Sequence, residues 1–232
     1  MMRQKLCLAA SCAYRAIVFD FEGTLVDFQW RLEPAEAELR AAFAGIGLSG
    51  EDFAQGGYAT MWNAAVDTLA PRGRMAELRR ALCPIYDRWD LDALDRWAPR
   101  PGAAQLLHRL AAAGVHVGMV SNVGRTALAQ ALHRFGFAPY LAPVVTRDDA
   151  THMKPSAEGI LRVLAQWRLA AGEALFVGDS RADVLGARAA GLPVAIIKGG
   201  ECDEAAFADL SPDYLISQLD ELVELLGRAP GA

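Results

Sequence analysis

Short apolar runs alternate with helical patterns along most of the chain. Five apolar runs and a weaker sixth, each bounded by turn-forming residues, predict buried strands at Ala16 to Phe19, Val115 to Val120, Pro143 to Thr146, Ala174 to Val177, Pro193 to Ile197 and Tyr214 to Ile216. Between them, apolar residues at spacings of three and four predict helices at Pro101 to Ala113, Arg125 to Phe135, Ser156 to Leu169, Ala182 to Ala190 and Gln218 to Leu226. Near-continuous apolar strands that alternate with helices are typical of a parallel sheet covered on both faces. The pattern therefore predicts an α/β fold with a Rossmann-like parallel sheet core and helices on both faces.

Residues 27–99 break this alternation. Apolar spacing there predicts no convincing strand but three helices, at Glu33 to Ala44, Glu51 to Leu69 and Met75 to Trp89. Four of the five tryptophans lie in this segment, at Trp30, Trp62, Trp89 and Trp97. We expect these large side chains to supply packing area, with a substrate cleft as the alternative for Trp30 or Trp62. The sequence thus predicts an α-helical insert at 27–99 and a core built from 15–26 and 100–232.

The composition is that of a globular chain without a broad basic surface. Of the 232 residues, 53% are hydrophobic and 22% are charged, and these proportions exclude intrinsic disorder. The formal net charge of -5 offers no general attraction for a phosphate backbone or an anionic bilayer. No apolar run approaches the ~20 residues of a membrane span. We therefore expect neither nucleic acid nor a membrane as a partner.

The cysteines and the first residues bear on location. Four cysteines, without the spacing of zinc ligands, are scattered at Cys7, Cys12, Cys83 and Cys202. This usage favours free thiols in a reducing compartment, so we expect no disulfides and a cytoplasmic protein. The apolar stretch from Leu6 to Ala13 is short even for a signal peptide, and we expect residues 1–14 to form a disordered leader.

Polar side chains follow four of the predicted strands. Asp20 and Glu22 come directly after the first strand, where Gly23 permits a tight turn. A hydroxyl and an amide end the second strand, a cation follows the third, and two carboxylates four residues apart follow the fourth, at Ser121, Asn122, Lys154, Asp179 and Asp183. Because the carboxyl ends of parallel strands meet at one edge of a sheet, we expect these side chains to lie together. Their convergence indicates a ligand site more strongly than any one motif does.

In this order and at these strand ends, the residues resemble the motifs of the haloacid dehalogenase superfamily. The resemblance covers nearly the whole chain from about Arg15, through an Asp-x-Asp-Gly-Thr-like loop at 20–24, Ser121, Lys154 and a Gly-Asp-x-x-x-Asp segment at 178–183. The helical insert resembles the cap of the branch that includes phosphoglycolate phosphatases and β-phosphoglucomutases. The resemblance implies an Mg²⁺-dependent phosphatase of small phosphorylated metabolites, a monomer or homodimer, that acts through an aspartyl-phosphate.

The resemblance also implies a role for each carboxylate. Asp20 would be the nucleophile that attacks phosphorus. A carboxylate and a phosphoryl group repel each other, so Mg²⁺ held by Asp20, the Glu22 backbone carbonyl and Asp179 would neutralise that charge. Asp183 would be a further metal ligand or would orient Asp179.

The phosphoryl group itself would be bound by Ser121 and Lys154, and Lys154 would also hold Asp20 in place. Only three of the 23 basic residues are lysines, so a chain that prefers arginine keeps the compact point charge of lysine at position 154. The other candidates for substrate contact are Gly23, Thr24, Asn122, Arg31 and Arg125.

Glu22 departs from the family pattern. Phosphatases of this superfamily usually carry a second Asp there, which protonates the leaving group and later activates water. The extra methylene of Glu22 moves the proton by ~1.5 Å in a site that tolerates little misplacement. Three alternatives follow: an acid/base suited to a particular substrate or cap geometry, a slow phosphatase, or a silent protein that binds phosphate ligands. A phosphomutase shares the same core residues, whereas a metal-free dehalogenase fits the acidic 178–183 segment poorly.

Overall fold

A six-stranded parallel sheet forms the centre of the structure, a computed structural model that describes residues 14–226. The strands are β1 (Ala16–Phe19), β2 (His116–Val120), β3 (Val144–Val145), β4 (Ala174–Gly178), β5 (Val194–Ile197) and β6 (Tyr214–Ile216). They lie in the order β3-β2-β1-β4-β5-β6, and each neighbouring pair is parallel. β1 therefore lies at the point where the strand order reverses, which is where open α/β sheets bind ligands.

Alternate residues of β1 face two hydrophobic clusters. Ile17 and Phe19 belong to one cluster, whereas Ala16 and Val18 belong to the other, and all four are buried. In the described part of the chain, the first cluster is covered by α5 (Ala103–Ala112), α6 (Arg125–Arg134) and α9 (Glu221–Leu226), and the second by α7 (Glu158–Trp167) and α8 (Arg181–Ala189). The predicted fold class, a parallel sheet with helices on both faces, is confirmed.

Several predicted elements are shorter in the structure, and at two of them a side chain bonds to the backbone at the altered end. The third strand stops at Val145, since the Thr146 N–H donates to the Asp149 carboxylate at 2.9 Å. The helix predicted to begin at Ser156 begins at Glu158, whose N–H donates to Ser156 Oγ at 3.2 Å. Both polar side chains compete locally with regular backbone hydrogen bonding.

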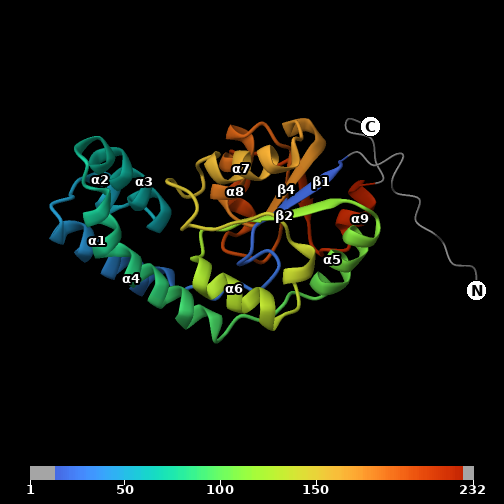
Figure 1. Cartoon of the computed structure of the whole chain (residues 1–232), viewed down its shortest axis with the longest axis horizontal. Helices are drawn as coiled ribbons and strands as arrows, with labels where there is room; N and C mark the ends of the chain where they lie inside the picture. Colours follow the sequence, from blue (N-terminus) through green and yellow to red (C-terminus); the bar gives the residue numbers. More distant parts are fainter. Residues whose placement is uncertain (1–13, 227–232) are drawn as a thin grey trace, which may run out of the picture.

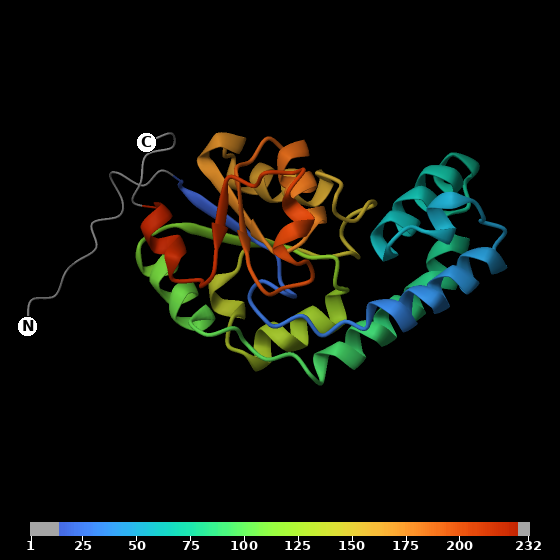
Figure 2. The ribbon, with the colours of Figure 1, turned by 180° about the vertical axis from the view of Figure 1, so that it is seen from behind.

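Helices α1–α4 form a group to one side of the sheet (Figures 1 and 2). Their bounds are α1 (Leu32–Gly45), α2 (Glu51–Ala54), α3 (Tyr58–Leu69) and α4 (Met75–Leu94). The prediction of one helix from Glu51 to Leu69 is wrong, because Gly56 and Gly57 interrupt the helix and separate α2 from α3. Gly57 is extended, with φ -69 and ψ 167, and a Cβ at Gly56 would lie 2.1 Å from the Asp52 carbonyl oxygen. We call residues 27–99 the helical segment.

The helical segment is tied to the sheet at both of its ends. Val26 forms an antiparallel bridge with Pro99, and the Asp27 N–H donates to the Ala98 carbonyl at 3.0 Å. The last helix, α4, runs beyond its predicted end to Leu94 and packs against α6. The two chain connections therefore lie side by side, and α4 carries side chains from the segment toward the carboxyl edge of the sheet.

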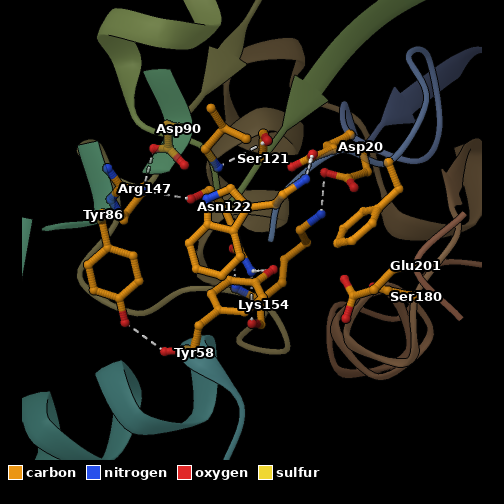
Figure 3. A pocket seen from close by; sticks show the side chains of 14 residues that line it. Asp20, Tyr58, Tyr86, Asp90, Ser121, Asn122, Arg147, Lys154, Ser180 and Glu201 are labelled. Atoms are coloured by element: carbon orange, nitrogen blue, oxygen red, sulfur yellow. Dashed lines mark hydrogen bonds and ion pairs between the residues drawn. The ribbon is translucent and has the colours of Figure 1, made fainter. Parts of the chain in front are cut away.

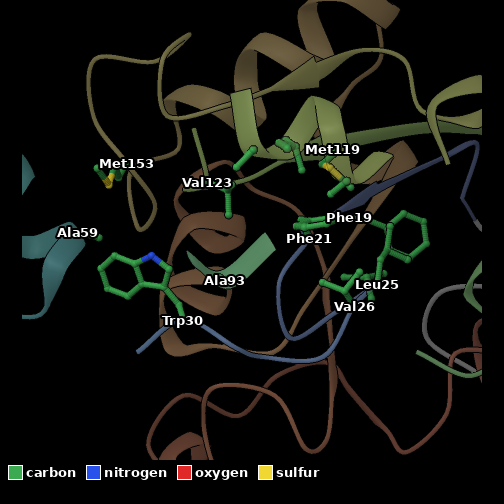
Figure 4. Close-up of a cluster of buried hydrophobic side chains, with 14 of the residues drawn as sticks. Phe19, Phe21, Leu25, Val26, Trp30, Ala59, Ala93, Met119, Val123 and Met153 are labelled. Atoms are coloured by element: carbon green, nitrogen blue, oxygen red, sulfur yellow. The ribbon is translucent and has the colours of Figure 1, made fainter. Parts of the chain in front are cut away.

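The hydrophobic cluster of β1 continues into the helical segment. Trp30 belongs to the same cluster as Phe19 and Phe21 of the core and Ala59 of α3 (Figure 4). Short 3-10 turns complete the described structure, at Ala70–Arg72, Ala138–Tyr140, Ala171–Glu173 and Glu204–Phe207. Between residues 14 and 226, no helix combines the length and the apolar character needed to cross a bilayer.

The predicted leader lies outside the described residues, apart from Tyr14. That residue is buried, and its hydroxyl lies 3.0 Å from the Tyr214 hydroxyl, so Tyr14 packs beside β6. Cys83 and Cys202 are free thiols, whereas Cys7 and Cys12 also lie outside the described residues.

Candidate active site

The carboxyl ends of the strands and the helical segment line a shared pocket (Figure 3). Asp20 directly follows β1, Ser121 directly follows β2, and Lys154 lies in the loop between β3 and α7. The sheet side of the pocket is lined by Asp20, Glu22, Ser121, Asn122, Val123, Arg147, Lys154, Ser180 and Glu201. The helical segment contributes Phe28, Trp30, Tyr58, Tyr86 and Asp90. Residues far apart in the sequence thus meet where the strand order reverses.

Lys154 bridges two carboxylates at the base of the pocket. Its Nζ lies 2.5 Å from Asp20 Oδ1 and 2.7 Å from Asp183 Oδ1. Burial lowers the pKa of this ammonium group, but Asp183 and Asp20 raise it more, so the net pKa lies above its ordinary value. The Lys154 N–H donates to Asn122 Oδ1 at 2.9 Å, which holds the loop against the end of β2. Lys154 is therefore a fixed positive charge beside Asp20.

Asp179 is held by groups on both of its carboxylate oxygens. Thr24 Oγ1 donates to Oδ1 at 2.7 Å, and the Glu201 N–H donates to Oδ2 at 2.7 Å. The backbone comes very close on both sides, because a Cβ at Gly23 or Gly200 would lie 2.0 or 2.2 Å from Oδ2. Gly23 also has a φ of +79, which strongly favours glycine. Gly23 and Thr24 thus position Asp179.

Three buried carboxylates meet closely enough to hold a divalent cation. Single oxygens of Asp20, Asp179 and Asp183 all lie within 4.8 Å of one another. Burial raises the pKa of Asp20 to about 6, against the lowering effect of Lys154. Burial and the neighbouring Asp183 and Asp20 raise the pKa of Asp179 well above its ordinary value. A cation would relieve this repulsion, and hard carboxylate oxygens are the donors that Mg²⁺ prefers, so the donor set fits that metal.

Asp183 has protein donors on both oxygens. Oδ1 receives Lys154 Nζ, whereas Oδ2 receives the N–H groups of Asp179 and Ser180, each at 3.0 Å, and Ser180 Oγ at 2.8 Å. Ser180 is the N-cap of α8, and its hydroxyl accepts from the Asp183 N–H at 3.3 Å. This arrangement favours the orienting role for Asp183, since the carboxylate fixes the backbone of Asp179 and the ammonium of Lys154.

Ser121 and Asn122 directly follow β2 and line the pocket that also contains Asp20. Ser121 is buried, and its Oγ accepts the Val123 N–H at 3.2 Å, which leaves the hydroxyl proton for another acceptor. Asn122 Nδ2 donates to the Lys154 carbonyl at 3.3 Å and contacts the Tyr58 hydroxyl at 3.5 Å. Asn122 therefore joins the sheet edge to α3 of the helical segment.

Glu22 lines the pocket and is fixed through a single oxygen. Its Oε1 accepts the N–H groups of Gln29 at 2.8 Å and Trp30 at 2.6 Å, and the Trp97 indole at 2.8 Å. Burial raises the pKa of Glu22 to about 8, although these hydrogen bonds lower it in part. The raised pKa favours the protonated form at neutral pH, and Glu22 lines the same pocket as Asp20.

A buried ion pair joins the helical segment to the loop after β3. Arg147 Nη1 lies 2.7 Å from Asp90 Oδ2, and Nη2 lies 2.5 Å from Asp87 Oδ1. The Gly124 N–H also donates to Asp90 Oδ2 at 2.8 Å. The side chains of Arg147 and Asp90 are only 1% and 3% exposed, and the guanidinium lies over the Tyr86 ring at 5.0 Å. This cluster forms the wall of the pocket opposite Lys154 (Figure 3).

Sequence reasoning did not single out several residues of the pocket. Arg147 follows β3 and obeys the same strand-end rule as Asp20, so its position was a usable signal. Asp90, Tyr58 and Tyr86 gave no such signal, because only the packing of the segment against the sheet brings them here. Glu201 follows β5 in the chain, so its position after a strand was a usable signal as well.

Four of the expected substrate residues do not line the pocket. Gly23 and Thr24 lie against Asp179 instead, and two arginines lie elsewhere. Arg31 is not among the residues that line the pocket, and its Nε is 3.7 Å from Asp92. Arg125 is likewise absent from the lining, and its guanidinium pairs with Asp149 at the surface. Of the two tryptophans for which a cleft was the alternative, Trp30 lines the pocket. Trp62 is buried, with its indole N–H donating to the Thr151 carbonyl at 3.0 Å.

Comparison with known proteins decides the family. The model of the haloacid dehalogenase-like hydrolases matches residues 14–191. The chain belongs to the haloacid dehalogenase-like hydrolases. This result confirms the predicted resemblance and the prediction that the chain is an enzyme.

Relatives of this haloacid dehalogenase-like hydrolase cover nearly its whole length. A phosphoglycolate phosphatase of Yersinia pseudotuberculosis is 28% identical over 219 residues, 93% of this chain and 94% of that protein. A phosphoglycolate phosphatase of Shigella boydii is 29% identical over 92% of each chain. A crystal structure from Haemophilus somnus, described as a predicted phosphoglycolate phosphatase, has a TM-score of 0.65 at 19% identity and covers 92% of this chain and 98% of its own. The structural likeness shows the shared fold.

Proposed function

We propose that the protein is an Mg²⁺-dependent phosphatase of small phosphorylated metabolites that acts through an aspartyl-phosphate on Asp20. The observation that carries the proposal is the convergence of Asp20, Asp179 and Asp183 within 4.8 Å, with Lys154 Nζ 2.5 Å from Asp20. Such a cluster of buried carboxylates is costly unless it holds a cation. The relatives named phosphoglycolate phosphatase support the same reaction class.

In this mechanism an Asp20 oxygen attacks phosphorus and forms the P–O bond while the bond to the leaving alcohol breaks. When bound by Asp20, Asp179 and the Glu22 carbonyl, Mg²⁺ supplies positive charge that offsets the repulsion between carboxylate and phosphoryl oxygens. Lys154 keeps Asp20 in place and, with the Ser121 hydroxyl, stabilises the phosphoryl oxygens. Asp183 keeps Lys154 and the Asp179 backbone in position.

Glu22 takes the part of the general acid and base. Its raised pKa, about 8, keeps a proton on the carboxyl group for the leaving alcohol. After the alcohol departs, the resulting carboxylate takes a proton from the water that hydrolyses the aspartyl-phosphate. The hydrogen bonds to Oε1 leave Oε2 for both proton transfers.

The helical segment is proposed to act as a cap over the core, with 15–26 and 100–232 as the core itself. Its support is that Trp30, Tyr58 and Tyr86 from the segment face the catalytic edge of the sheet across the pocket. Closure over a bound substrate would exclude water during the first transfer. A cytoplasmic location stays a prediction from the cysteine usage.

The decisive experiment is phosphate release from p-nitrophenyl phosphate with Mg²⁺. Asp20→Asn should abolish turnover, and EDTA should do so reversibly. Asp220→Asn provides a matched control. The substitution removes the same charge, and Asp220 is exposed on the surface. Turnover that persists in Asp20→Asn, or in EDTA, would overturn the mechanism.

A further inference from the structure

Lys154 and Arg147 are the cations among the described residues that line the pocket. Lys154 is committed to Asp20 and Asp183 and lies where the phosphoryl group binds. A second anionic group on a substrate would therefore have to be bound by Arg147, at the opposite wall.

Arg147 is already neutralised. Its two terminal nitrogens are paired with Asp90 at 2.7 Å and Asp87 at 2.5 Å, and Nη1 also donates to the Asn122 carbonyl at 3.2 Å. Asp90 is buried together with Arg147, whereas Asp87 is 48% exposed and lies outside the pocket lining. The wall therefore offers no unpaired positive charge to a second anionic group.

The remaining polar groups add no positive charge. Glu201 adds a carboxyl group from the sheet side, and burial raises its pKa to about 7. Apart from Asp90, the side chains that the helical segment contributes are aromatic. Trp30 and Tyr58 stack at a centroid distance of 4.8 Å, and both line the pocket. Trp30 is 7% exposed, and its indole N–H has no hydrogen-bond partner. A buried unpaired donor of this kind is stabilised by an acceptor oxygen such as a hydroxyl.

We infer that the enzyme selects phosphate monoesters of uncharged, hydroxylated alcohols and rejects those that carry a second anionic group. The inference rests on the proposed function and names its substrate class. It separates this chain from its named relatives, since glycolate, the alcohol in phosphoglycolate, carries a carboxylate group. A substrate carboxylate would face Asp90 and Glu201, and no free cation would pair with it. A hydroxyl group is uncharged, so these carboxyl groups do not repel it, and its oxygen can accept a hydrogen bond from the Trp30 N–H.

A matched pair of substrates tests the inference. Glycerol 3-phosphate and 3-phosphoglycerate have the same carbon skeleton and differ in a hydroxymethyl group against a carboxylate. We expect kcat/KM with Mg²⁺ to be at least about tenfold higher for glycerol 3-phosphate. Equal values, or a preference for 3-phosphoglycerate or 2-phosphoglycolate, would overturn the inference.

Binding separates this inference from the proposed function. The two substrates are titrated into the Asp20→Asn variant with Mg²⁺ by calorimetry, where the same order of affinity is expected. If the wild type releases no phosphate from either compound or from p-nitrophenyl phosphate, the proposed function fails, and the order of the two Kd values still decides the inference.

Two variants test the physical cause. Asp87→Asn removes one of the two charges that neutralise Arg147, and Asp87 is half-exposed, so the fold should tolerate it. We expect the ratio of kcat/KM for glycerol 3-phosphate to kcat/KM for 3-phosphoglycerate to fall by about threefold in this variant. Glu77→Gln removes the same charge from α4 at a surface pair with Arg74 and should leave the preference unchanged. An unchanged preference in Asp87→Asn would refute the electrostatic cause.

The Trp30 donor is tested with a substrate that lacks hydroxyl groups. Trp30→Phe should lower kcat/KM for glycerol 3-phosphate more than for propyl phosphate, because only the first can use the indole N–H. A purely structural role for Trp30 would lower both equally, and that outcome would remove the hydroxyl group from the inferred substrate class.

Discussion

Trp97 Nε1 donates a hydrogen bond of 2.8 Å to Glu22 Oε1, across 75 positions of the chain. Gln29 and Trp30 donate their backbone N–H groups to the same oxygen. Trp97 lies next to one connection between the sheet and the helical segment, and Gln29 and Trp30 lie next to the other. The orientation of Glu22 is therefore set jointly by both connections. The glutamate side chain at this position is longer than that of aspartate, and the hydrogen bond from the Trp97 indole holds its carboxyl group.

Removal of the indole N–H should slow catalysis more than binding. In Trp97→Phe the ring keeps its edge-to-face contact with Phe21, but Glu22 loses one donor. A lost hydrogen bond to a protonated carboxyl group costs about 0.5–1.5 kcal/mol, so we expect kcat to fall roughly 2-fold to 10-fold while KM stays within about twofold. Steady-state kinetics on p-nitrophenyl phosphate measure both.

Trp89→Phe is the matched control for that variant. Trp89 also donates to a carboxylate, Glu38, but outside the pocket, so its kcat should stay near that of the wild type. In a Glu22→Asp background the shorter side chain no longer fits the indole, and Trp97→Phe should cost much less there. Equal losses in both backgrounds would contradict a specific pairing of Trp97 with Glu22.

The raised pKa of Glu22 predicts a pH-dependent stability of the metal-free protein. Unfolded Glu22 loses its proton near 4.5, whereas the folded group holds it to about 8. Between these values the unfolded state binds fewer protons, so this contribution to stability is complete below pH 4.5 and is lost as the pH rises through 8. Glu22→Gln cannot lose a proton and should lack this slope.

Urea unfolding in EDTA from pH 5 to 9 measures the difference. The free energy of unfolding of the wild type should fall, relative to that of Glu22→Gln, by roughly 2–5 kcal/mol across this range. Other buried carboxylates titrate in both proteins, so they cancel in the comparison. If the free energy of unfolding of the two proteins changed with pH in the same way, folding would not raise the pKa of Glu22.

The strand-end rule explains why part of the site was predictable from the sequence. Asp20 and Asp179 end β1 and β4, which pair directly, so their meeting follows from topology alone. Asp90 sits on α4 among charged residues that look like a solvated helix face, and nothing local shows that it pairs with Arg147. The interruption between α2 and α3 did have a local signal, the two adjacent glycines Gly56 and Gly57. The prediction followed the apolar spacing alone and so extended one helix across them.

The Arg147 ion pair predicts a large loss of stability when one partner is removed. Arg147→Met keeps much of the side-chain volume but leaves Asp90 buried without its cation. Breaking a buried pair in this way costs about 3–5 kcal/mol, which urea unfolding monitored by circular dichroism would detect. Arg125→Met removes an exposed pair with Asp149 and should cost less than about 1 kcal/mol. Similar small losses in both variants would mean that the Arg147 cluster contributes little to stability.

The carboxylate cluster predicts that Mg²⁺ stabilises the folded protein even without substrate. Asp20 and Asp179 repel each other in the metal-free fold, since each has a raised pKa to which the other carboxylates contribute. Mg²⁺ at about 100 times its Kd should raise Tm by about 5–10 °C in thermal unfolding without substrate. Asp179→Asn removes a ligand and should lose most of that shift, whereas the surface variant Asp220→Asn should keep it. If the Asp179→Asn protein kept the full shift in Tm, Asp179 would not be a ligand, and the cation would have to bind elsewhere. Thr24 and the Glu201 backbone N–H hold the Asp179 carboxylate at this edge of the sheet.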